Sequence, residues 1–517
     1  MPTTAKTEPA RESIADLPEL QPLMGSNEVL RDRVHPDGWS NPTPDGRYNL
    51  VVLGGGTAGL VAAAGAAGLG AKVALVEKHL LGGDCLVTGC VPSKALIRSA
   101  RAAAEARRAD RLGVHVDGVR VDFAALMERM RARRSEIARH DSAQRFTDLG
   151  VDVYLGEGRF TGPSSLEVDG RTLEFAKAVV ATGAKAAQPP IPGIEDVGVL
   201  TNQSLFSLTD LPEHLVVVGG GPIGCEMAQS FARFGARVTL LEGGPRLMAN
   251  DDARAAEVVA KALREDGIDL RLGARVVRFE GSGASKTTVI ETADGTESIR
   301  SDQILVAIGR SPRVEGIGLE DAGVEFDRRS GVTVDDRLRT TNKNVFAAGD
   351  VGSRFQFTHA ADFLARTVLR NALFFGRAKA SDLVIPWSTF TDPEVAHVGL
   401  TEAMAAEQGV EHSVIEVDLV DNDRAVLDAE DEGFVKVVHD PKGRVLGGTV
   451  VAAHAGEMIG ELVTAVQHGT TLGTLSGVIH PYPTVADAIR RAGDAFNRTR
   501  LTPGKAKILS RILAWRR

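Results

Sequence analysis

Residues 48–59 read Tyr-Asn-Leu-Val-Val-Leu-Gly-Gly-Gly-Thr-Ala-Gly, and this stretch decides the fold class. A short apolar run leads directly into a G-x-G-x-x-G pattern formed by Gly54, Gly56 and Gly59. An alanine-rich helical stretch follows, and then a second strand that ends in Glu77. Strand, tight turn, helix and strand, with an acid about 20 residues on, form the dinucleotide-binding fingerprint. The glycines let the backbone approach a pyrophosphate, and Glu77 accepts a hydrogen bond from a ribose hydroxyl.

The same pattern recurs in the middle of the chain. Leu215 to Val218 reads as a strand, residues 219–224 repeat the glycine spacing, and the next strand, Arg237 to Leu241, runs into Glu242. Each acid lies 23 residues after the first glycine of its copy. Two copies at matched spacing predict two dinucleotide sites on an α/β fold with two Rossmann-like domains. The glycines predicted to contact the second dinucleotide are Gly219, Gly221 and Gly224.

A pair of cysteines lies shortly after the first fingerprint. The chain has only three cysteines, and Cys85 and Cys90 are separated by four residues. Pro92 suits the first turn of a helix, which places Cys90 at the helix N-terminus. The positive end of the helix dipole stabilises an anion there, so the thiolate, which is the reactive form of cysteine, is favoured. The pair is therefore a candidate redox centre, the alternative being two small buried residues.

Together these residues resemble the FAD-dependent pyridine nucleotide–disulfide oxidoreductases, a family that includes lipoamide dehydrogenase, glutathione reductase and mercuric reductase. The resemblance runs from Tyr48 to about Arg500. It implies FAD at the first fingerprint and NADH, or NADPH, at the second. Two segments resemble the crossovers between the nucleotide domains, and a third resembles the second FAD motif. Further cofactor contacts are implied for Thr182, Gly183, Gly309, Arg310, Gly349, Asp350 and His359.

The resemblance also implies roles for individual residues. Cys90 is the thiolate next to the flavin, and Cys85 is the thiol that meets the acceptor. Lys94 and Glu226 occupy the positions of a family pair that lies near the flavin N5. Asp350 would bond the flavin's ribityl chain, and the helix from about His359 would point its N-terminus at the flavin. The third cysteine, Cys225, is read as a packing residue.

The choice of nicotinamide depends on Glu242. An acid accepts from the free 2′-hydroxyl of NADH and repels the 2′-phosphate of NADPH. Arg246 is near enough in sequence to weaken this preference. We expect NADH, with NADPH as the alternative.

The segment around Tyr482 departs from lipoamide dehydrogenase and glutathione reductase. Those enzymes carry a histidine base before the proline, and a glutamate five residues on. Aligned on Pro483, the base position is Tyr482 and the orienting acid is Asp487. A tyrosine, with a pKa near 10, is a poor base at neutral pH. His480 remains a second candidate for proton transfer. If the segment is extended, however, the side chain of His480 would point away from the site that Tyr482 faces.

Mercuric reductase also carries a tyrosine at that position, so the chain resembles it best. The cysteine pair near the C-terminus of mercuric reductase is missing, because the last cysteine here is Cys225. An N-terminal Cys-x-x-Cys domain is missing too. The sequence therefore predicts an NAD(P)H oxidoreductase with an unidentified small-molecule or metal-ion acceptor, and no resident metal. Mercuric ion reduction, dihydrolipoyl-type disulfide reduction and a diaphorase activity that needs no cysteines remain alternatives.

Composition limits the class of protein. The net charge of −8 argues against a nucleic-acid binder, and three cysteines fit a reducing compartment. The first 20 residues show no basic region followed by an apolar core, so a cytoplasmic protein is expected.

The predicted organisation has five parts. Residues 1–46 form a polar extension without periodicity. Residues 47–195 and 313–382 form an FAD-binding domain, within which 92–108 and 123–146 read as helices, and residues 196–312 form an NAD(P)-binding domain. Residues 383–517 form an α+β interface domain, which implies a homodimer.

The C-terminal segment, residues 505–517, is basic, with apolar residues at helical spacing. It predicts either packing on the dimer or a weak contact with an anionic membrane surface. The latter motivates a hypothesis from another class, a flavin-bound redox sensor or membrane-attached binding protein.

Overall fold

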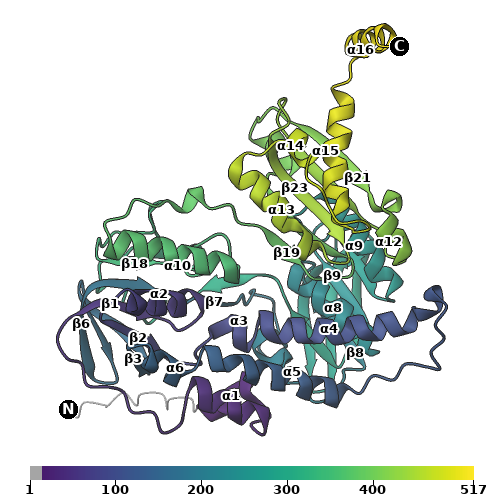
Figure 1. The fold of residues 1–517 in the computed structure, drawn as a ribbon. Coiled ribbons are helices and arrows are strands. Elements are labelled where there is room, and N and C mark those ends of the chain that lie inside the picture. The colour runs from purple at the N-terminus through teal and green to yellow at the C-terminus, as the bar shows by residue number, and fades with distance from the viewer. Residues whose placement is uncertain (1–13) are drawn as a thin grey trace, which may run out of the picture.

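A sheet with a parallel centre and an antiparallel edge, with helices on its faces, carries the first fingerprint (Figure 1). The computed structural model describes residues 14–517. Strand β1 (Tyr48–Leu53) is paired in parallel with β2 (Val73–Glu77) on one side and with β6 (Arg171–Val180) on the other. The sheet order is β3-β2-β1-β6-β5-β4, and β18 pairs with β6. Because both faces are covered, β1 reads as a nearly continuous apolar run and not as an alternating one. The other strands are β3 (Val151–Leu155), β4 (Gly158–Gly162), β5 (Ser165–Val168) and β18 (Val345–Ala347).

The second fingerprint lies on a smaller parallel sheet of order β10-β9-β8-β14. It leads from β8 (His214–Val218) into α8 (Pro222–Phe234) and then β9 (Arg237–Glu242). An antiparallel sheet of β11, β12 and β13 lies beside it. The two segments predicted as crossovers, residues 179–183 and 306–310, lead into β7 (Ala184–Ala186) and β15 (Arg310–Pro312), which pair with each other. The remaining elements of this part are α7 (Asn202–Leu205), α9 (Ala253–Glu265), β10 (Asp269–Leu272), β11 (Arg275–Ser282), β12 (Ser285–Thr292), β13 (Gly295–Ser301) and β14 (Gln303–Val306). The short strands β16 (Phe326–Asp327) and β17 (Gly331–Val332) pair with each other and pack on the core of the first nucleotide domain.

The C-terminal part is an antiparallel sheet of order β19-β20-β23-β22-β21, with helices α13 and α15 packed on it. This confirms the predicted fold class: two Rossmann-like domains and a C-terminal α+β domain. The exact domain boundaries stay a prediction. The elements of the C-terminal part are β19 (Trp387–Thr389), β20 (Glu394–Gly399), α11 (Glu402–Glu407), β21 (Ser413–Asp418), α12 (Asp423–Leu427), β22 (Phe434–His439), β23 (Val445–Ala452), α13 (Ala455–His468), α14 (Leu472–Leu475) and α15 (Asp487–Thr499).

The sequence predicts the helices that follow the cysteine pair correctly, with one exception. Helix α3 (Gly83–Val87) carries Cys85, and α4 (Cys90–Arg107) begins at Cys90. The predicted helix over 123–146 is two helices, α5 (Phe123–Ile137) and α6 (Ala143–Asp148), with a short 3-10 turn between them. The break follows from Ser142, whose side chain accepts from the Arg145 N–H and starts a new helix.

The polar N-terminal extension is more structured than predicted. Within its described part, helix α1 (Ser26–Val34) lies along α5 (Figure 1). Leu20, Leu30 and Val34 are completely buried. The extension is therefore part of the core over these residues, which corrects the prediction. The prediction for residues 1–13 lies outside the described residues.

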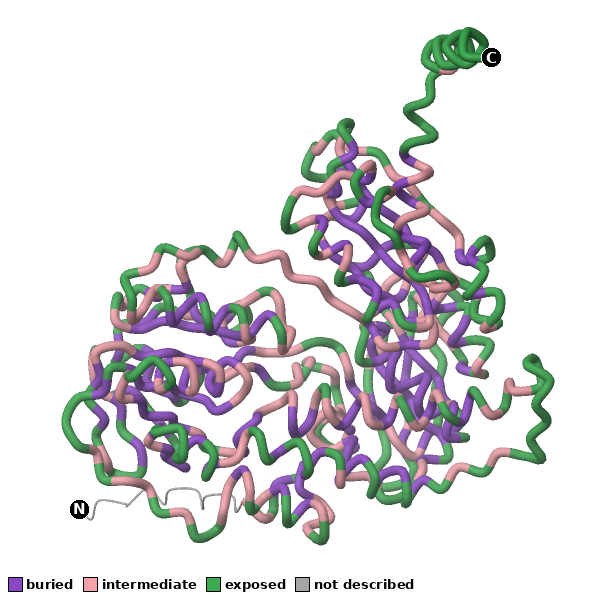
Figure 2. Tube along the Cα trace, in the orientation of Figure 1, coloured by how far each residue is buried: buried purple, intermediate pink, exposed green. Residues whose placement is uncertain are grey.

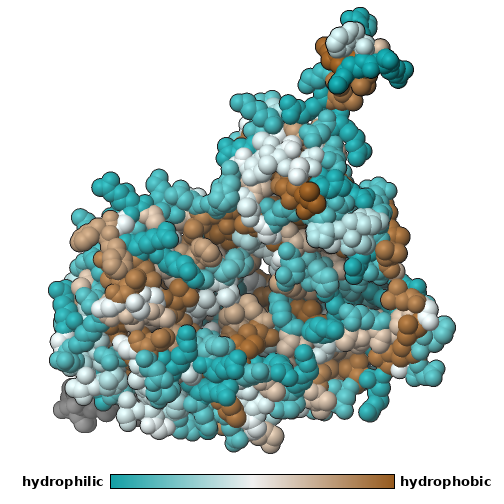
Figure 3. All heavy atoms as spheres, viewed as in Figure 1, coloured by the Kyte–Doolittle hydropathy of each residue, from teal (hydrophilic) through white to brown (hydrophobic). Residues whose placement is uncertain are grey.

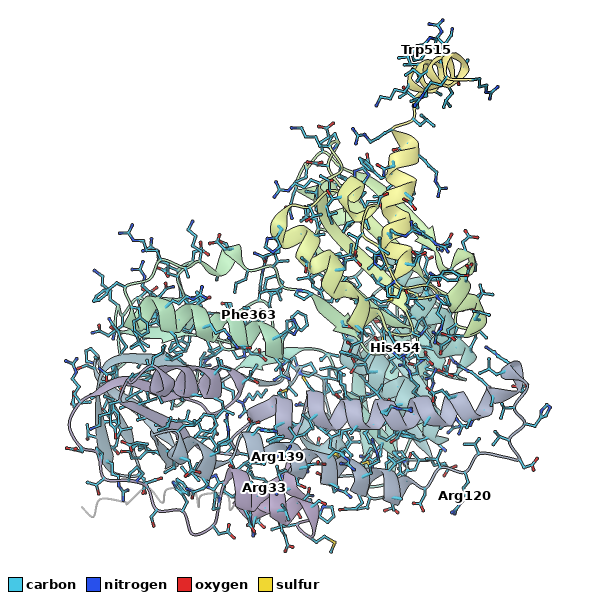
Figure 4. The ribbon with its side chains drawn as sticks, in the orientation of Figure 1. Arg33, Arg120, Arg139, Phe363, His454 and Trp515 are labelled. Carbon is cyan, nitrogen blue, oxygen red and sulfur yellow. The ribbon has the colours of Figure 1, made fainter. Side chains whose placement is uncertain are left out.

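The basic C-terminal segment forms the expected helix, α16 (Pro503–Trp515), which stands away from the rest of the chain (Figures 1 and 2). All its residues except Ala506 are exposed, including the apolar ones, and Trp515 is 86% exposed near its tip (Figure 4). Figure 3 shows these apolar side chains as a brown patch. Contact with the dimer partner or a membrane surface stays a prediction. Over residues 14–517 the helices are too short or too polar to span a bilayer.

Candidate functional site

A cavity of about 1840 Å³ runs between the two nucleotide domains. Figure 3 shows the surface hollowed where these parts meet. Typical small-molecule sites have volumes of roughly 300–1,000 Å³, so this cavity has room for two extended cofactors. Most of the residues predicted to bind cofactors line it: Gly54, Gly56, Glu77, Thr182, Gly183, Gly219, Gly221, Glu242, Gly309, Arg310, Gly349, Asp350 and His359.

The first fingerprint builds a tight turn that only glycine can make. Gly54 has φ +109°, and a Cβ on it would lie 2.4 Å from the Ala181 oxygen. Gly59 does not line the cavity, because it lets α2 (Thr57–Gly68) pack on this turn: its Cβ would lie 1.8 Å from the Gly54 oxygen. Glu77 accepts from the Gly55 N–H at 2.6 Å and holds the turn closed.

The second fingerprint repeats this geometry. Gly219 has φ +110°, Gly224 lies against its carbonyl, and Glu242 accepts from the Gly220 N–H at 2.7 Å. A Cβ on Gly221 would meet nothing within 4 Å, so this glycine leaves the N-terminus of α8 open. Open N–H groups at a helix N-terminus suit a pyrophosphate. The residues present thus fit two dinucleotides.

The two thiols of the cysteine pair are held in opposite electrostatic settings. The hydrogen bond that Cys85 donates lowers the pKa of Cys90 to about 6, and Thr358 and the charge of Lys94 act in the same direction against the opposing effect of burial. Thr358 Oγ1 lies 3.3 Å from Cys90 Sγ. The same interaction with Cys90, together with burial, raises the pKa of Cys85. Cys90 is therefore the thiol that ionises first, and Cys85 stays protonated.

Lys94 and Glu226 form the pair that the sequence predicts. Lys94 Nζ lies 2.8 Å from Glu226 Oε2 and sits over the ring of Phe390, 4.4 Å from its centroid. The buried Glu226 also accepts from the Phe390 N–H at 2.9 Å. Both carboxylate oxygens are thus used, which fixes the position of Lys94 on α4, close to Cys90.

Arg310 links the cysteine segment to the second FAD motif. Its guanidinium pairs with Asp84, next to Cys85, and its Nε lies 3.4 Å from Asp350 Oδ2. Burial raises the pKa of Asp350, and Arg310 opposes that shift. His359 lies in the first turn of α10 (Thr358–Leu373), and its Nε2 is 2.7 Å from the Pro386 oxygen.

Tyr482 and Asp487 do not hydrogen-bond to each other but to other residues. Tyr482 is 75% exposed, and its hydroxyl donates to Asp423 at 3.0 Å, which raises its pKa. Burial opposes ionisation of Asp487, but hydrogen bonds from Arg490 and Arg491 outweigh it and lower its pKa. Neither Tyr482 nor Asp487 lines the cavity that holds the cysteines of the same chain.

Cys225 is completely buried, and its thiol donates to the Gly220 oxygen at 3.4 Å. Burial raises its pKa, as expected for a packing residue. Within residues 14–517, His, Cys, Asp and Glu side chains form no group of three or more suited to hold a metal ion.

Sequence reasoning missed Thr358 and Phe390. Thr358 directly precedes His359, which was selected, but a hydroxyl at a helix start has many roles and gave no specific signal. Phe390 belongs to the segment that opens the C-terminal domain, and its contact with Lys94 depends on the tertiary fold.

Comparisons with known proteins agree with this geometry. The family described as "Pyridine nucleotide-disulphide oxidoreductase" matches residues 48–363, and its dimerisation domain matches residues 385–492. A mercuric reductase of Bacillus cereus is 36% identical over 454 residues, which cover 87% of this chain and 72% of that protein. A dihydrolipoyl dehydrogenase of Haloferax volcanii is 36% identical over 465 residues, covering 86% of this chain and 95% of that protein.

Solved structures with the same architecture include two bacterial proteins. The HOCl-induced flavoprotein disulfide reductase RclA from Escherichia coli, solved as a Cu(II) complex, aligns with a TM-score of 0.77 and 30% identity over 86% of this chain and 98% of that one. LpdA from Mycobacterium tuberculosis aligns with a TM-score of 0.78 and 29% identity over 86% and 99% of the two chains. The chain therefore belongs to the pyridine nucleotide-disulphide oxidoreductases, flavoproteins that use FAD and NAD(P)H.

Proposed function

We propose that this protein is a homodimeric oxidoreductase that passes electrons from NADH, through FAD, to the Cys85–Cys90 disulfide and on to a soft metal ion. Bound FAD supplies a two-electron carrier between the nicotinamide and the disulfide. The observation that carries the proposal is the polarised thiol pair, with the pKa of Cys90 lowered to about 6 and that of Cys85 raised.

The protein's own groups provide positions and charges. Lys94, fixed by Glu226, lies on the cysteine helix and favours the Cys90 thiolate. Cys85 stays protonated and is the thiol left to meet an acceptor. Arg310 ties the segment that carries Cys85 to the FAD motif, so the dithiol and the cofactor keep their relative position.

The nicotinamide site favours NADH. Glu242 lies where it would meet the 2′-position of the ribose, and its oxygens accept from two backbone N–H groups. The guanidinium of Arg246 donates to the carbonyls of Met248 and Asp251 at 3.1 and 3.0 Å, and also to that of Ala249. An arginine used in this way is not presented to a 2′-phosphate. The negative charge of Glu242 then repels the 2′-phosphate of NADPH and favours NADH.

The acceptor side lacks a histidine base, which disfavours dithiol exchange of the dihydrolipoyl type. Tyr482 occupies the base position. His480 is held by its own chain: Nε2 lies 2.8 Å from Glu461 Oε2, and Nδ1 lies 3.1 Å from the Val478 oxygen. Both ring nitrogens already face acceptors, so neither is offered to a thiol.

Soft metal ions suit this arrangement because thiolates are the ligands that they prefer. The proposal takes Hg(II) as the first candidate, from the mercuric reductases, and Cu(II) as the second, from the RclA complex. For mercury the reaction balances as NADH plus Hg(II) giving NAD⁺, Hg(0) and one proton. NADH reduces the disulfide to the Cys90 thiolate and the Cys85 thiol, and this pair then gives two electrons to Hg(II), releases one proton and returns to the disulfide.

The dimerisation domain supports a homodimer. The exposed Tyr482 lies on that domain, beside Ile479, which is 94% exposed. We expect this segment to complete the acceptor site of the partner subunit.

The test is anaerobic. The purified holoenzyme is reduced with NADH, and the flavin absorbance is followed while a thiol-complexed mercuric salt is added. A long-wavelength charge-transfer band on reduction supports the Cys90–flavin pair. Rapid reoxidation over many turnovers supports metal reduction without tail cysteines, whereas no reoxidation, or a dead-end complex, contradicts it.

A further inference from the structure

We infer that residues 14–41, here called the N-terminal brace, position the Cys85–Cys90 segment through one buried side chain, Arg134. The inference rests on the proposed dithiol function. The brace precedes residue 48, where the match to the family begins. Arg134 touches neither thiol in the hydrogen bonds of the structure, so it is a positioning residue.

Arg134 lies on α5 and is completely buried. Its Nη1 donates to the Val87 oxygen at 2.7 Å, and its Nη2 donates to the Glu19 oxygen at 3.0 Å and to Asn27 Oδ1 at 2.7 Å. Val87 ends α3, the helix that carries Cys85, and the last carbonyls of a helix lack partners within it. One guanidinium thus joins the end of α3 to two points of the brace. Burying a cation is costly unless it is bonded, so this link is specific.

The brace is itself fixed. Asn27 Nδ2 donates to the carbonyls of Leu20 and Pro22, both at 3.0 Å, so Asn27 holds its acceptor oxygen towards Arg134. Arg33, on α1 (Figure 4), donates to the Ser135 carbonyl one residue after Arg134. Further on, Trp39 Nε1 donates to the Val153 oxygen at 3.1 Å. These contacts make the brace a firm support.

The brace also reaches the other end of the cysteine segment. The Leu81 N–H donates to the Val34 oxygen at 3.3 Å, and His35 Nδ1 bonds the His79 oxygen. Residues 79–81 lead directly into α3. The brace therefore holds this segment before Cys85, and Arg134 holds it after Cys85.

The second nucleotide domain completes the support. Ser207 Oγ donates to the Pro18 oxygen of the brace. Asn202 Nδ2 lies 3.1 Å from Asp84 Oδ1 and 3.3 Å from the Thr88 oxygen. Between the two cysteines, the Thr88 oxygen thus has a partner in Asn202 of the second nucleotide domain, and the Val87 oxygen has a partner in Arg134, which is itself bonded to the brace.

The functional consequence concerns exchange at Cys85. The two sulfurs must approach to bonding distance as the disulfide and separate as the dithiol, while Cys85 still faces its acceptor. A displacement of about 1 Å can cost roughly 100-fold in rate. We expect R134Q to slow transfer to the acceptor about tenfold, with flavin reduction by NADH changed less than about twofold.

The test uses the full-length holoenzyme with NADH and the aromatic disulfide DTNB as probe. The matched control is R131Q, because Arg131 is a buried arginine of the same helix that donates to the Leu208 oxygen instead. The readouts are the rate of flavin reduction, the rate of reoxidation by DTNB, and the pH midpoint of the charge-transfer band. R134Q should slow reoxidation and move or weaken the band, and R131Q should do neither.

A second pair of variants covers the case in which R134Q does not fold. N27A removes the brace's side-chain acceptor for Arg134, and its control N41A removes a brace side chain that bonds Leu155 instead. N27A should slow reoxidation, and its effect should not add to that of R134Q. Equal effects of each variant and its control, at a temperature where both are folded, overturn the inference. Failure of the wild-type protein to show the band, or to be reoxidised by the mercuric salt, overturns the proposed function instead.

Discussion

Replacing Thr358 by valine should raise the pKa of Cys90. The hydroxyl of Thr358 lies 3.3 Å from Cys90 Sγ and stabilises the thiolate, and valine keeps the shape of the side chain without the hydrogen bond. Because the thiolate is the charged form, losing a donor to it disfavours ionisation and moves the pKa upward.

The size of the shift follows from the strength of one bond. A hydrogen bond to a charged group contributes about 1.5–3 kcal/mol, and a pKa unit corresponds to about 1.4 kcal/mol. Taking the lower figure, since sulfur is a weak acceptor, the pKa of Cys90 should rise from about 6 to about 7. At about pH 6.5 the thiolate fraction then falls roughly threefold.

The assay is a pH titration of the charge-transfer absorbance in the NADH-reduced enzyme. The band is absent below the pKa of Cys90 and present above it, so its midpoint should move to higher pH in T358V. T358S keeps the hydroxyl and should keep the midpoint. An unchanged midpoint in T358V, or an equal shift in T358S, would refute the reasoning and leave the low pKa to Cys85 and Lys94 alone.

Three further changes test other parts of the site. C85A should lower acceptor reduction at least about 100-fold while the flavin is still reduced by NADH, measured by stopped-flow absorbance; full turnover would favour a diaphorase. E242A should narrow the ratio of kcat/KM for NADH over NADPH about tenfold, whereas R246A should leave that ratio unchanged, because Arg246 bonds backbone carbonyls. Deleting residues 503–517 should weaken either sedimentation with anionic vesicles or dimerisation in analytical ultracentrifugation, and an effect on neither would leave α16 without a binding role.

Much of the fold can be predicted because the fingerprints are local. Gly54 and Gly219 need a positive φ, the acids follow at a fixed spacing, and buried parallel strands have to be continuously apolar. The break between α5 and α6 could not be read in the same way. The residues on either side continue a helical pattern, and the break depends on Ser142 accepting from a backbone N–H.

The N-terminal extension could not be predicted for a different reason. Its buried residues Leu17, Leu20, Leu30 and Val34 are spread over short 3-10 turns and one helix of 9 residues. Such a short element gains stability from packing and not from its own pattern. Only the tertiary structure shows that it covers α5 and contacts the cysteine segment.

The candidate site likewise has a part that could be predicted from motifs and a part that depends on the tertiary structure. The thiols, Lys94 and Glu226 come from motifs, and the structure brings them together. Tyr482 was predicted to have Asp487 as its acid, but it donates to Asp423, which lies 59 residues earlier in the sequence. That contact depends on how α12 and the segment before α15 fold against each other, and sequence spacing carries no information about it.

The charge asymmetry of the thiol pair bears on the acceptor. Cys85 has a raised pKa and stays protonated, and His480, the histidine nearest in sequence to the base position, has both ring nitrogens facing acceptors of its own chain. The rate of reaction with a neutral disulfide depends on the small fraction of Cys85 that is ionised, because only the thiolate attacks. The reaction with a soft cation does not depend on that fraction in the same way, since a metal ion that coordinates a thiol displaces its proton. We therefore expect this arrangement to slow disulfide exchange more than metal capture. On the proposed function, a thiophilic metal ion should be a better acceptor than a disulfide.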